Sequence, residues 1–136
     1  MFTQIKLLAV SFFTILILDM IWLGLIANSF YVRNLLPIGR IEDHHFKPVL
    51  WAAGLVYLFL AFGINYFLLP RLDSGSGFVS TFLLGAFLGF IIYGVYDMTN
   101  YSTLKDFPLH LALADIVWGS CVSGLASVAT VFIRDL

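Results

Sequence analysis

Four long apolar runs constrain this sequence more than any other feature. They cover residues 5–27, 48–69, 78–96 and 108–133. A helix rises about 1.5 Å per residue, so about 20 apolar residues are needed to cross a hydrocarbon core about 30 Å thick. The sequence therefore predicts an all-α fold, namely a polytopic integral membrane protein that forms a four-transmembrane-helix bundle with both termini on one side.

The composition agrees with a chain whose solvent is lipid. Apolar residues make up 61% of the sequence and charged residues 11%, whereas soluble domains are about 45–50% apolar. The four spans and their short connections use nearly all of the 136 residues, so we expect a single membrane domain over residues 1–136. The net charge of −1 provides no basic surface for nucleic acid, and membrane lipids are the expected surroundings.

The connecting segments do not settle the orientation in the membrane. Residues 28–47 mix aromatic, basic and acidic types, as in a segment that lies at the headgroup level. Cytoplasmic loops usually carry an excess of Lys and Arg. The side with the termini carries three such residues, and the side with residues 28–47 and 97–107, here called the loop side, carries four. This difference is too small to assign the two sides.

Small residues mark a tight helix pairing. Gly85 and Gly89 are four residues apart in the third run, and Gly119 and Gly124 lie among several serines in the fourth. Helices in lipid approach closely where such residues face each other. The spacing predicts a seam, either between the third and fourth spans of one chain or between two chains as a homodimer through the Gly85/Gly89 face.

Two aspartates lie deep in the apolar runs at one level. Asp19 with Trp22, and Asp115 with Trp118, repeat a pattern of an acid and an indole three residues apart, which puts both on one helical face. At about 1.5 Å per residue, Asp19 lies roughly 12 Å and Asp115 roughly 10 Å from the loop-side end of its run. A charged group at such depth costs about 3 kcal/mol and normally faces a bundle interior. We therefore expect Asp19 and Asp115 to meet in a polar site that can share a proton; the alternative is that each acid only fixes helix pairing.

Five further residues are candidates for this ligand and proton site. Tyr57 of the second run falls in the same layer. Tyr93, Asp97 and Asn100 share one helical face if the third helix continues past residue 96, and they are predicted to line a mouth above the paired acids. His110, one turn into the fourth run, could pass protons to the site. The plainer alternatives are packing among helices for Tyr57, a capping turn for Asp97 and Asn100, and a place at the membrane interface for His110.

The sequence gives no reason to assign a metal site or a cofactor. Glu42, Asp43, His44 and His45 are adjacent, but zinc sites space their ligands differently, so we predict a solvated loop. Cys121 is the single cysteine and provides neither a disulfide nor a thiolate cluster. Motifs of the common soluble enzymes, such as a P-loop or a nucleophile elbow, are missing from the sequence.

A resemblance to a known family extends over essentially the whole chain. The residues that carry it are Asp19, Trp22, the segment Tyr96–Leu104, Asp115, Trp118 and Gly119. With them the sequence resembles a family of small predicted bacterial membrane proteins that is catalogued only as a domain of unknown function. The resemblance implies a four-span protein of the bacterial inner membrane. It implies no activity, cofactor or catalytic residue.

Three functions of different classes fit these residues. The leading hypothesis is a membrane-embedded site in which the acids and indoles bind a small cationic or amphipathic ligand and exchange protons during transport. The alternative is an enzyme that acts on a lipid or isoprenoid tail, with one carboxyl group as general acid and the other as base. The third is a helper subunit that stabilises a larger membrane complex, with the acids as links between helices.

Overall fold

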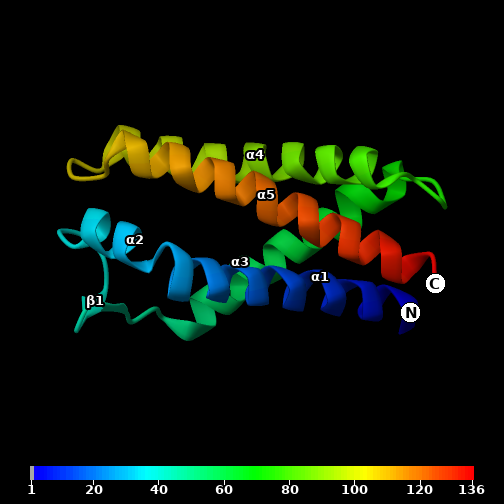
Figure 1. Ribbon diagram of the computed structural model, residues 1–136, viewed down its shortest axis with the longest axis horizontal. Helices are drawn as coiled ribbons and strands as arrows, with labels where there is room; N and C mark the ends of the chain where they lie inside the picture. Colours follow the sequence, from blue (N-terminus) through cyan, green and yellow to red (C-terminus); the bar gives the residue numbers. More distant parts are fainter. Residues whose placement is uncertain (1) are drawn as a thin grey trace.

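The computed structural model describes residues 2–136, and four of its helical segments are long and apolar enough to cross a membrane. These segments are Phe2–Ile26, Leu50–Arg71, Phe78–Thr103 and Leu109–Arg134. They confirm the predicted all-α four-helix bundle, and both ends of the chain lie at the same end of the molecule (Figure 1). In chain order the elements are α1 (Phe2–Ile21), the π-helical turn η1 (Trp22–Ile26), α2 (Asn28–Leu35), β1 (Ile41–Glu42), β2 (His45–Phe46), α3 (Leu50–Gly63), the π-helical turn η2 (Ile64–Leu68), the 3₁₀ turn η3 (Leu69–Arg71), α4 (Phe78–Thr103) and α5 (Leu109–Arg134).

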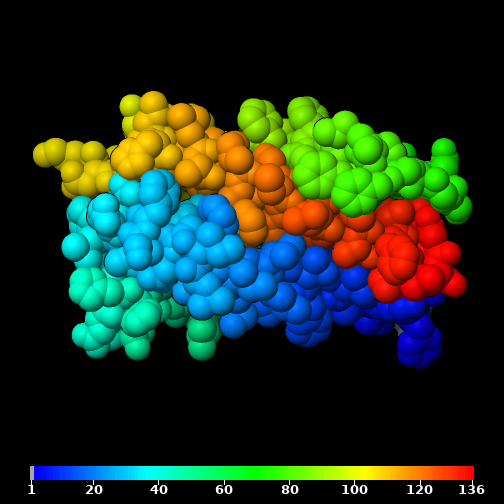
Figure 2. Space-filling view, in the orientation of Figure 1, coloured from blue at the N-terminus to red at the C-terminus, as the bar shows by residue number. Residues whose placement is uncertain are grey.

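The helices pack so that one face of α1 is buried along its whole length. Helices α4 and α5 lie side by side, while α1 packs against α5 and α3, and α3 crosses behind α1 in Figure 1. Figure 2, in the same orientation, shows the face of the molecule in front of α3, on which α1, α2, α4 and α5 are visible. Burial recurs every four residues along α1, at Leu7, Ser11, Ile15 and Asp19. Residues four apart lie on one helical face, so the packing of this stripe carries Asp19 into the bundle interior.

The small residues of α4 and α5 face each other within one chain. A Cβ atom at Gly85 would lie 2.7 Å from the Cβ of Ser127, and one at Gly89 would lie 2.7 Å from the Cβ of Ser123. Neither separation leaves room for a side chain, so glycine is what permits the close approach of the two backbones. The predicted seam is therefore intramolecular, and α5 occupies the Gly85/Gly89 face. A homodimer stays a prediction and would need another surface.

Residues 28–47 hold more regular structure than the predicted headgroup-level loop. The short helix α2 comes first, and strands β1 and β2 then pair antiparallel with Ile41 opposite Phe46. Asp43 and His44 have φ values of 49° and 61°, which are the positive values that a two-residue type I′ hairpin turn requires. The side chains of residues 42–45, predicted to form a solvated loop, are exposed at this turn.

Arg134, at the end of α5, connects this helix to the turn before α4. Its guanidinium donates hydrogen bonds to the carbonyl oxygens of Leu72 and Asp73, both at 2.9 Å, and forms an ion pair of 2.8 Å with Asp135. The Asp135 carboxylate also accepts a bond of 3.1 Å from the Gly75 N–H. The bonds from Arg134 and then from Gly75 hold the pKa of Asp135 below its ordinary value. The bonds made by the Asp135 carboxylate are therefore complete at neutral pH and are weakened as the pH falls through that lowered pKa, whereas the Arg134 bonds to the carbonyl oxygens remain.

We expect Arg134→Gln to speed backbone amide exchange in residues 72–77 by about ten-fold at neutral pH, because about 1.4 kcal/mol of hydrogen bonding to this turn is lost. Hydrogen–deuterium exchange followed by mass spectrometry measures the effect. Arg71→Gln is the matched control, since the Arg71 guanidinium bonds the carbonyl oxygen of Phe67 within its own helical segment. Equal exchange rates in the two variants would contradict the role given to Arg134.

Candidate functional site

The first part of the candidate site joins Asp19 of α1 to Trp118 of α5. The Asp19 side chain is 7% exposed, and its Oδ1 accepts a hydrogen bond of 2.6 Å from the Trp118 indole Nε1–H. The Tyr57 hydroxyl of α3 lies beside the same carboxyl group. Three of the four spans therefore contribute to the surroundings of Asp19.

The second part joins Asp115 of α5 to helix α2. The Tyr31 hydroxyl donates a hydrogen bond of 2.6 Å to Asp115 Oδ1, and the Trp22 indole Nε1–H donates one of 3.3 Å to the Tyr31 oxygen. The rings of Trp22 and Trp118 stack with centroids 4.5 Å apart and planes 7° apart. Asp19 therefore bonds directly to the indole of Trp118 on α5. Asp115 is linked through Tyr31 to the indole of Trp22, which follows α1. In both cases the acid is linked to the indole of the other helix and not to the indole three residues after it.

Asp97 of α4 is the third carboxyl group, and the structure corrects the place predicted for it. Its side chain is 1% exposed and faces the carboxyl group of Asp115, so it does not line an open mouth. The reason is the length of α4, which continues to Thr103. Asp97 thus lies about 9 Å before the end of the helix. Within residues 2–136, neither of its carboxyl oxygens has a hydrogen-bond partner.

Tyr93 lies one helical turn before Asp97 and fills the space between α4 and α5. Its ring packs directly on Gly119, where any Cβ atom would collide with the ring. Its hydroxyl is close enough to Asp19 and Asp115 to feel the charge of both. Tyr93 therefore packs in the seam between α4 and α5, beside the acids.

The acids of this site have no basic partner to neutralise them. Among residues 2–136 the ion pair formed is that of Arg134 with Asp135, at the other end of α5. Tyr31 is a neutral donor, because burial and then the charge of Asp115 raise the pKa of its phenol above its ordinary value. The described residues also contain no set of three His, Cys, Asp or Glu side chains arranged around one metal ion. Protons and neutral donors are thus what the chain itself supplies to the carboxyl groups.

Two predicted site residues lie outside this cluster. The exposed His110 bonds through Nε2 to the Asn34 Oδ1 at 2.6 Å, and its ring contacts that of Phe30. Asn100 is half-buried nearly one turn beyond Asp97, and its carbonyl oxygen accepts the Leu104 N–H at 2.8 Å where α4 ends. The structure therefore places both residues at the loop-side surface and not beside the acids.

Tyr31 is the site residue that the sequence prediction missed. The sequence predicts a loop at the headgroup level for residues 28–47, whereas Tyr31 lies on the buried face of α2 with Ala27 one turn before it. Apolar residues at positions 27, 31 and 35 are four apart, which is the spacing of one helical face. This signal was available, but a helix of eight residues is too short for it to be decisive.

A separate polar cluster lies in the half of the bundle that carries the termini. Ser11 Oγ and Thr130 Oγ1 are 2.9 Å apart, and Asn65 Nδ2 donates bonds of 2.8 Å to Ser11 Oγ and to the Ala61 carbonyl oxygen. These bonds join α1, the turn η2 and α5. The fully buried Ile15 lies between this cluster and Asp19 on the same face of α1. The acids are thus set apart from the terminal side by apolar packing and lie nearer the loop side.

Four apolar spans, with the buried carboxyl groups of Asp19 and Asp97 and the half-buried one of Asp115 between them, define this chain as a small multi-span membrane protein with an acidic site. Residues 4–132 match the model of the family described as predicted membrane protein (DUF2177), and the chain belongs to this family. The match confirms the relation that the sequence resemblance implied. No curated protein and no solved structure matches the chain.

Proposed function

We propose that this protein, in the inner membrane of a bacterial cell, binds a small cation at Asp97 and Asp115 in exchange for a proton, and that the exchange serves transport. The observation that carries the proposal is the Asp97 carboxyl group, which is 1% exposed and has no hydrogen-bond partner within residues 2–136. A buried polar group without a partner costs several kcal/mol, and an ionised one costs far more. Asp97 therefore needs either a proton or a bound cation.

Asp115 supplies the second half of this cation site. One of its oxygens is bonded to Tyr31, and its carboxyl group faces Asp97. Asp97 is buried and faces the half-buried Asp115. Two such neighbouring carboxyl groups strongly disfavour a second negative charge without a counter-ion, so we infer that one of them carries a proton. A monovalent cation that enters between them can replace this proton with little change in the total charge. This replacement couples cation binding to proton release.

The aromatic side chains favour a small ligand over a large one. The indoles of Trp22 and Trp118 lie face to face at 4.5 Å, so they do not form an open cage around a bulky cation. Asp19, held by Trp118, adds a third carboxyl group at the edge of the site. We infer that it attracts the cation without bonding to it directly.

Access to the acids is expected from the loop side, past Tyr31. Helix α2 carries Tyr31 over Asp115, and it is joined to α1 through the π-helical turn η1 and a break in helical geometry at Ala27. Single turns of π-helix inside α-helices often occur at functional sites. Release of the Tyr31 bond would uncover the carboxyl pair without moving a whole span.

The test measures cation binding and proton release together in the purified protein in lipid nanodiscs. Sodium, potassium, tetramethylammonium and ethidium ions are titrated in weak buffer with a pH-sensitive dye. We expect one of the small ions to bind and to release a proton at neutral pH. We expect Asp97→Asn to abolish this release and to weaken binding by at least ten-fold, because the site loses its exchangeable proton and one negative charge. Uptake of the bound ion by liposomes under an imposed pH gradient then tests transport.

Asp106→Asn is the matched control, since Asp106 is an exposed acid just beyond α4 on the loop side. It is expected to behave like the unchanged protein. If Asp19→Asn, Asp97→Asn and Asp115→Asn all insert normally and leave binding, proton release and uptake unchanged across pH, the proposal is wrong.

A second candidate is a helper subunit, which the two short hydrogen bonds favour. Asp19 and Asp115 each accept a bond of 2.6 Å from a neighbouring element, as expected where acids link helices. In that case no ion would bind, and Asp19→Asn would lower thermal stability without a change in any proton signal. The protein would also migrate with a larger membrane complex after mild solubilisation.

A further inference from the structure

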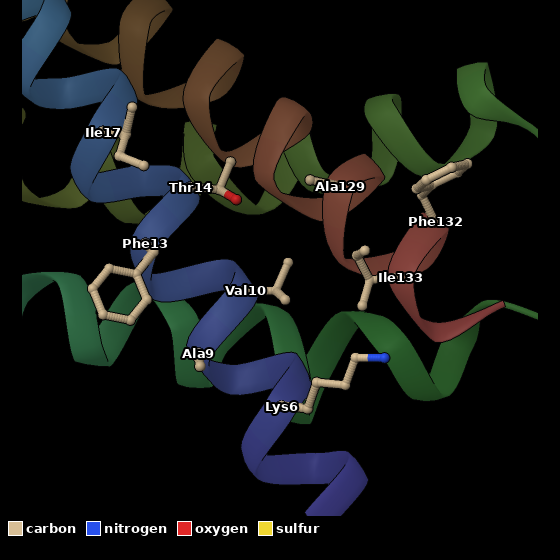
Figure 3. A pocket seen from close by; sticks show the side chains of 9 residues that line it. All are labelled: Lys6, Ala9, Val10, Phe13, Thr14, Ile17, Ala129, Phe132 and Ile133. Atoms are coloured by element: carbon tan, nitrogen blue, oxygen red, sulfur yellow. The ribbon is translucent and has the colours of Figure 1, made fainter. Parts of the chain in front are cut away.

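A groove on the lipid-facing surface lies between α1 and α5 in the half of the bundle near the termini. Its volume is about 560 Å³. Along α1 its wall extends from Lys6 to Ile17, and α5 contributes Ala129 and Phe132 (Figure 3). The groove belongs to the same face of the molecule that Figure 2 shows, and it is separate from the acidic site.

The length of the groove corresponds to one leaflet of a bilayer. The twelve residues from Lys6 to Ile17 rise about 16 Å along α1, which is about half of a hydrocarbon core about 30 Å thick. Except for Lys6 at one end and Thr14, its lining residues are apolar. Both walls are membrane-spanning helices, so hydrocarbon surrounds the groove. An acyl chain of one leaflet fits these dimensions and restores the dispersion contacts that an empty groove would lack.

Lys6 provides a positive charge at the surface end of the groove. It lies on the first turns of α1, and Figure 3 shows its side chain at the end of the groove, extending toward the α5 wall. Within residues 2–136, Lys6 forms no ion pair, whereas Arg134 nearby is bonded to Asp135 and to backbone carbonyl oxygens. A free ammonium group at the lipid–water boundary attracts an anionic headgroup. We infer that the groove binds one anionic phospholipid, with an acyl chain between α1 and α5 and its phosphate at Lys6.

The test compares phosphatidylglycerol with phosphatidylcholine that carries the same acyl chains. The full-length protein is purified in detergent, each lipid is titrated in, and bound lipids are counted by native mass spectrometry. We expect one phosphatidylglycerol to bind about five-fold more tightly than phosphatidylcholine, as one lysine near the surface allows. Lys6→Gln should make the two affinities equal. Ala129→Phe, which fills the groove, should weaken both lipids.

Two variants serve as controls. Lys105→Gln removes an exposed lysine on the loop side and should leave the preference unchanged, and Leu83→Phe adds bulk to the exposed face of α4 and should leave both affinities unchanged. An equal affinity of the unchanged protein for both lipids, or an undiminished preference in Lys6→Gln, would overturn the inference. So would a dimer that Ala129→Phe dissociates, because a second chain would then occupy the groove. Cation binding at the acids does not enter this measurement, so the two proposals can fail separately.

Discussion

Replacing Gly89 with leucine is expected to separate α4 from α5 and to lower the free energy of unfolding by more than about 3 kcal/mol. A side chain at this position would collide with the Gly119 carbonyl oxygen and would bring its Cβ to 2.7 Å from the Cβ of Ser123. Backbone and Cβ atoms cannot rotate away as a long side chain can. The two helices must therefore move apart, which also disturbs the contact of Tyr93 with Gly119.

Gly94→Leu is the matched control for this prediction. Gly94 lies on α4 five residues after Gly89, and a Cβ atom there would meet nothing within 4 Å. Leucine should be neutral or slightly stabilising at that site, because glycine costs about 1 kcal/mol in a helix interior. Reversible unfolding by sodium dodecyl sulfate in mixed micelles, followed by circular dichroism, gives both values. Similar unfolding curves for the two variants would show that the seam is not as tight as the structure indicates.

The spans could be predicted from sequence because length and hydropathy alone determine them. Their ends were less predictable. The third apolar run stops at residue 96, but α4 continues to Thr103 through polar residues. Hydroxyl groups of Ser102 and Thr103 bond back to the Thr99 carbonyl oxygen in its last turn. Backbone hydrogen bonding continues a helix whether or not its side chains are apolar, so a hydropathy profile locates the membrane boundary and not the helix end.

Counting residues along each span gives an expected depth for Asp19 and Asp115 in the membrane. It does not give the rotation of each helix about its own axis. The predicted meeting of these two acids stays a prediction, and in the structure each is bonded to a partner on another element. Trp118 bonds Asp19, and Tyr31 bonds Asp115. Which face of a helix meets which neighbour depends on the packing of all four spans, and a single sequence does not give that packing.

The burial of Asp97 and the exposure of His110 also show that depth along a span does not determine which way a side chain faces. The sequence predicts Asp97 at a mouth above the acids, and it predicts His110 either as a proton-passing residue or at the membrane interface. Asp97 follows Gly85 and Gly89 at multiples of four, so it lies on the buried seam face of α4. His110 lies on the outer face of α5 and contacts α2. Spacing from the glycine seam would have distinguished a buried acid from a surface residue better than depth did.

Trp118→Phe is also expected to have a large effect on stability, lowering the free energy of unfolding by about 2–3 kcal/mol. The variant removes the donor of the 2.6 Å bond to Asp19, which leaves a carboxyl group of 7% exposure without that partner. Loss of a partner by a buried polar group costs about 1–3 kcal/mol. It also replaces an indole stacked on Trp22 by a smaller ring, and such stacked pairs contribute about 0.5–1.5 kcal/mol.

Trp51 provides a control for the substitution of tryptophan by phenylalanine, because its side chain is 73% exposed. Trp51→Phe should change stability by less than about 0.5 kcal/mol. A double-mutant cycle of Trp118→Phe with Asp19→Leu then isolates the hydrogen bond. Interhelical bonds in membranes couple by about 0.6 kcal/mol on average and reach about 1.7 kcal/mol, and the short indole–carboxyl distance places this pair near the upper value. Additive effects of the two substitutions would mean that Asp19 and Trp118 are neighbours without being partners, and the acid would then depend on its proton alone for burial.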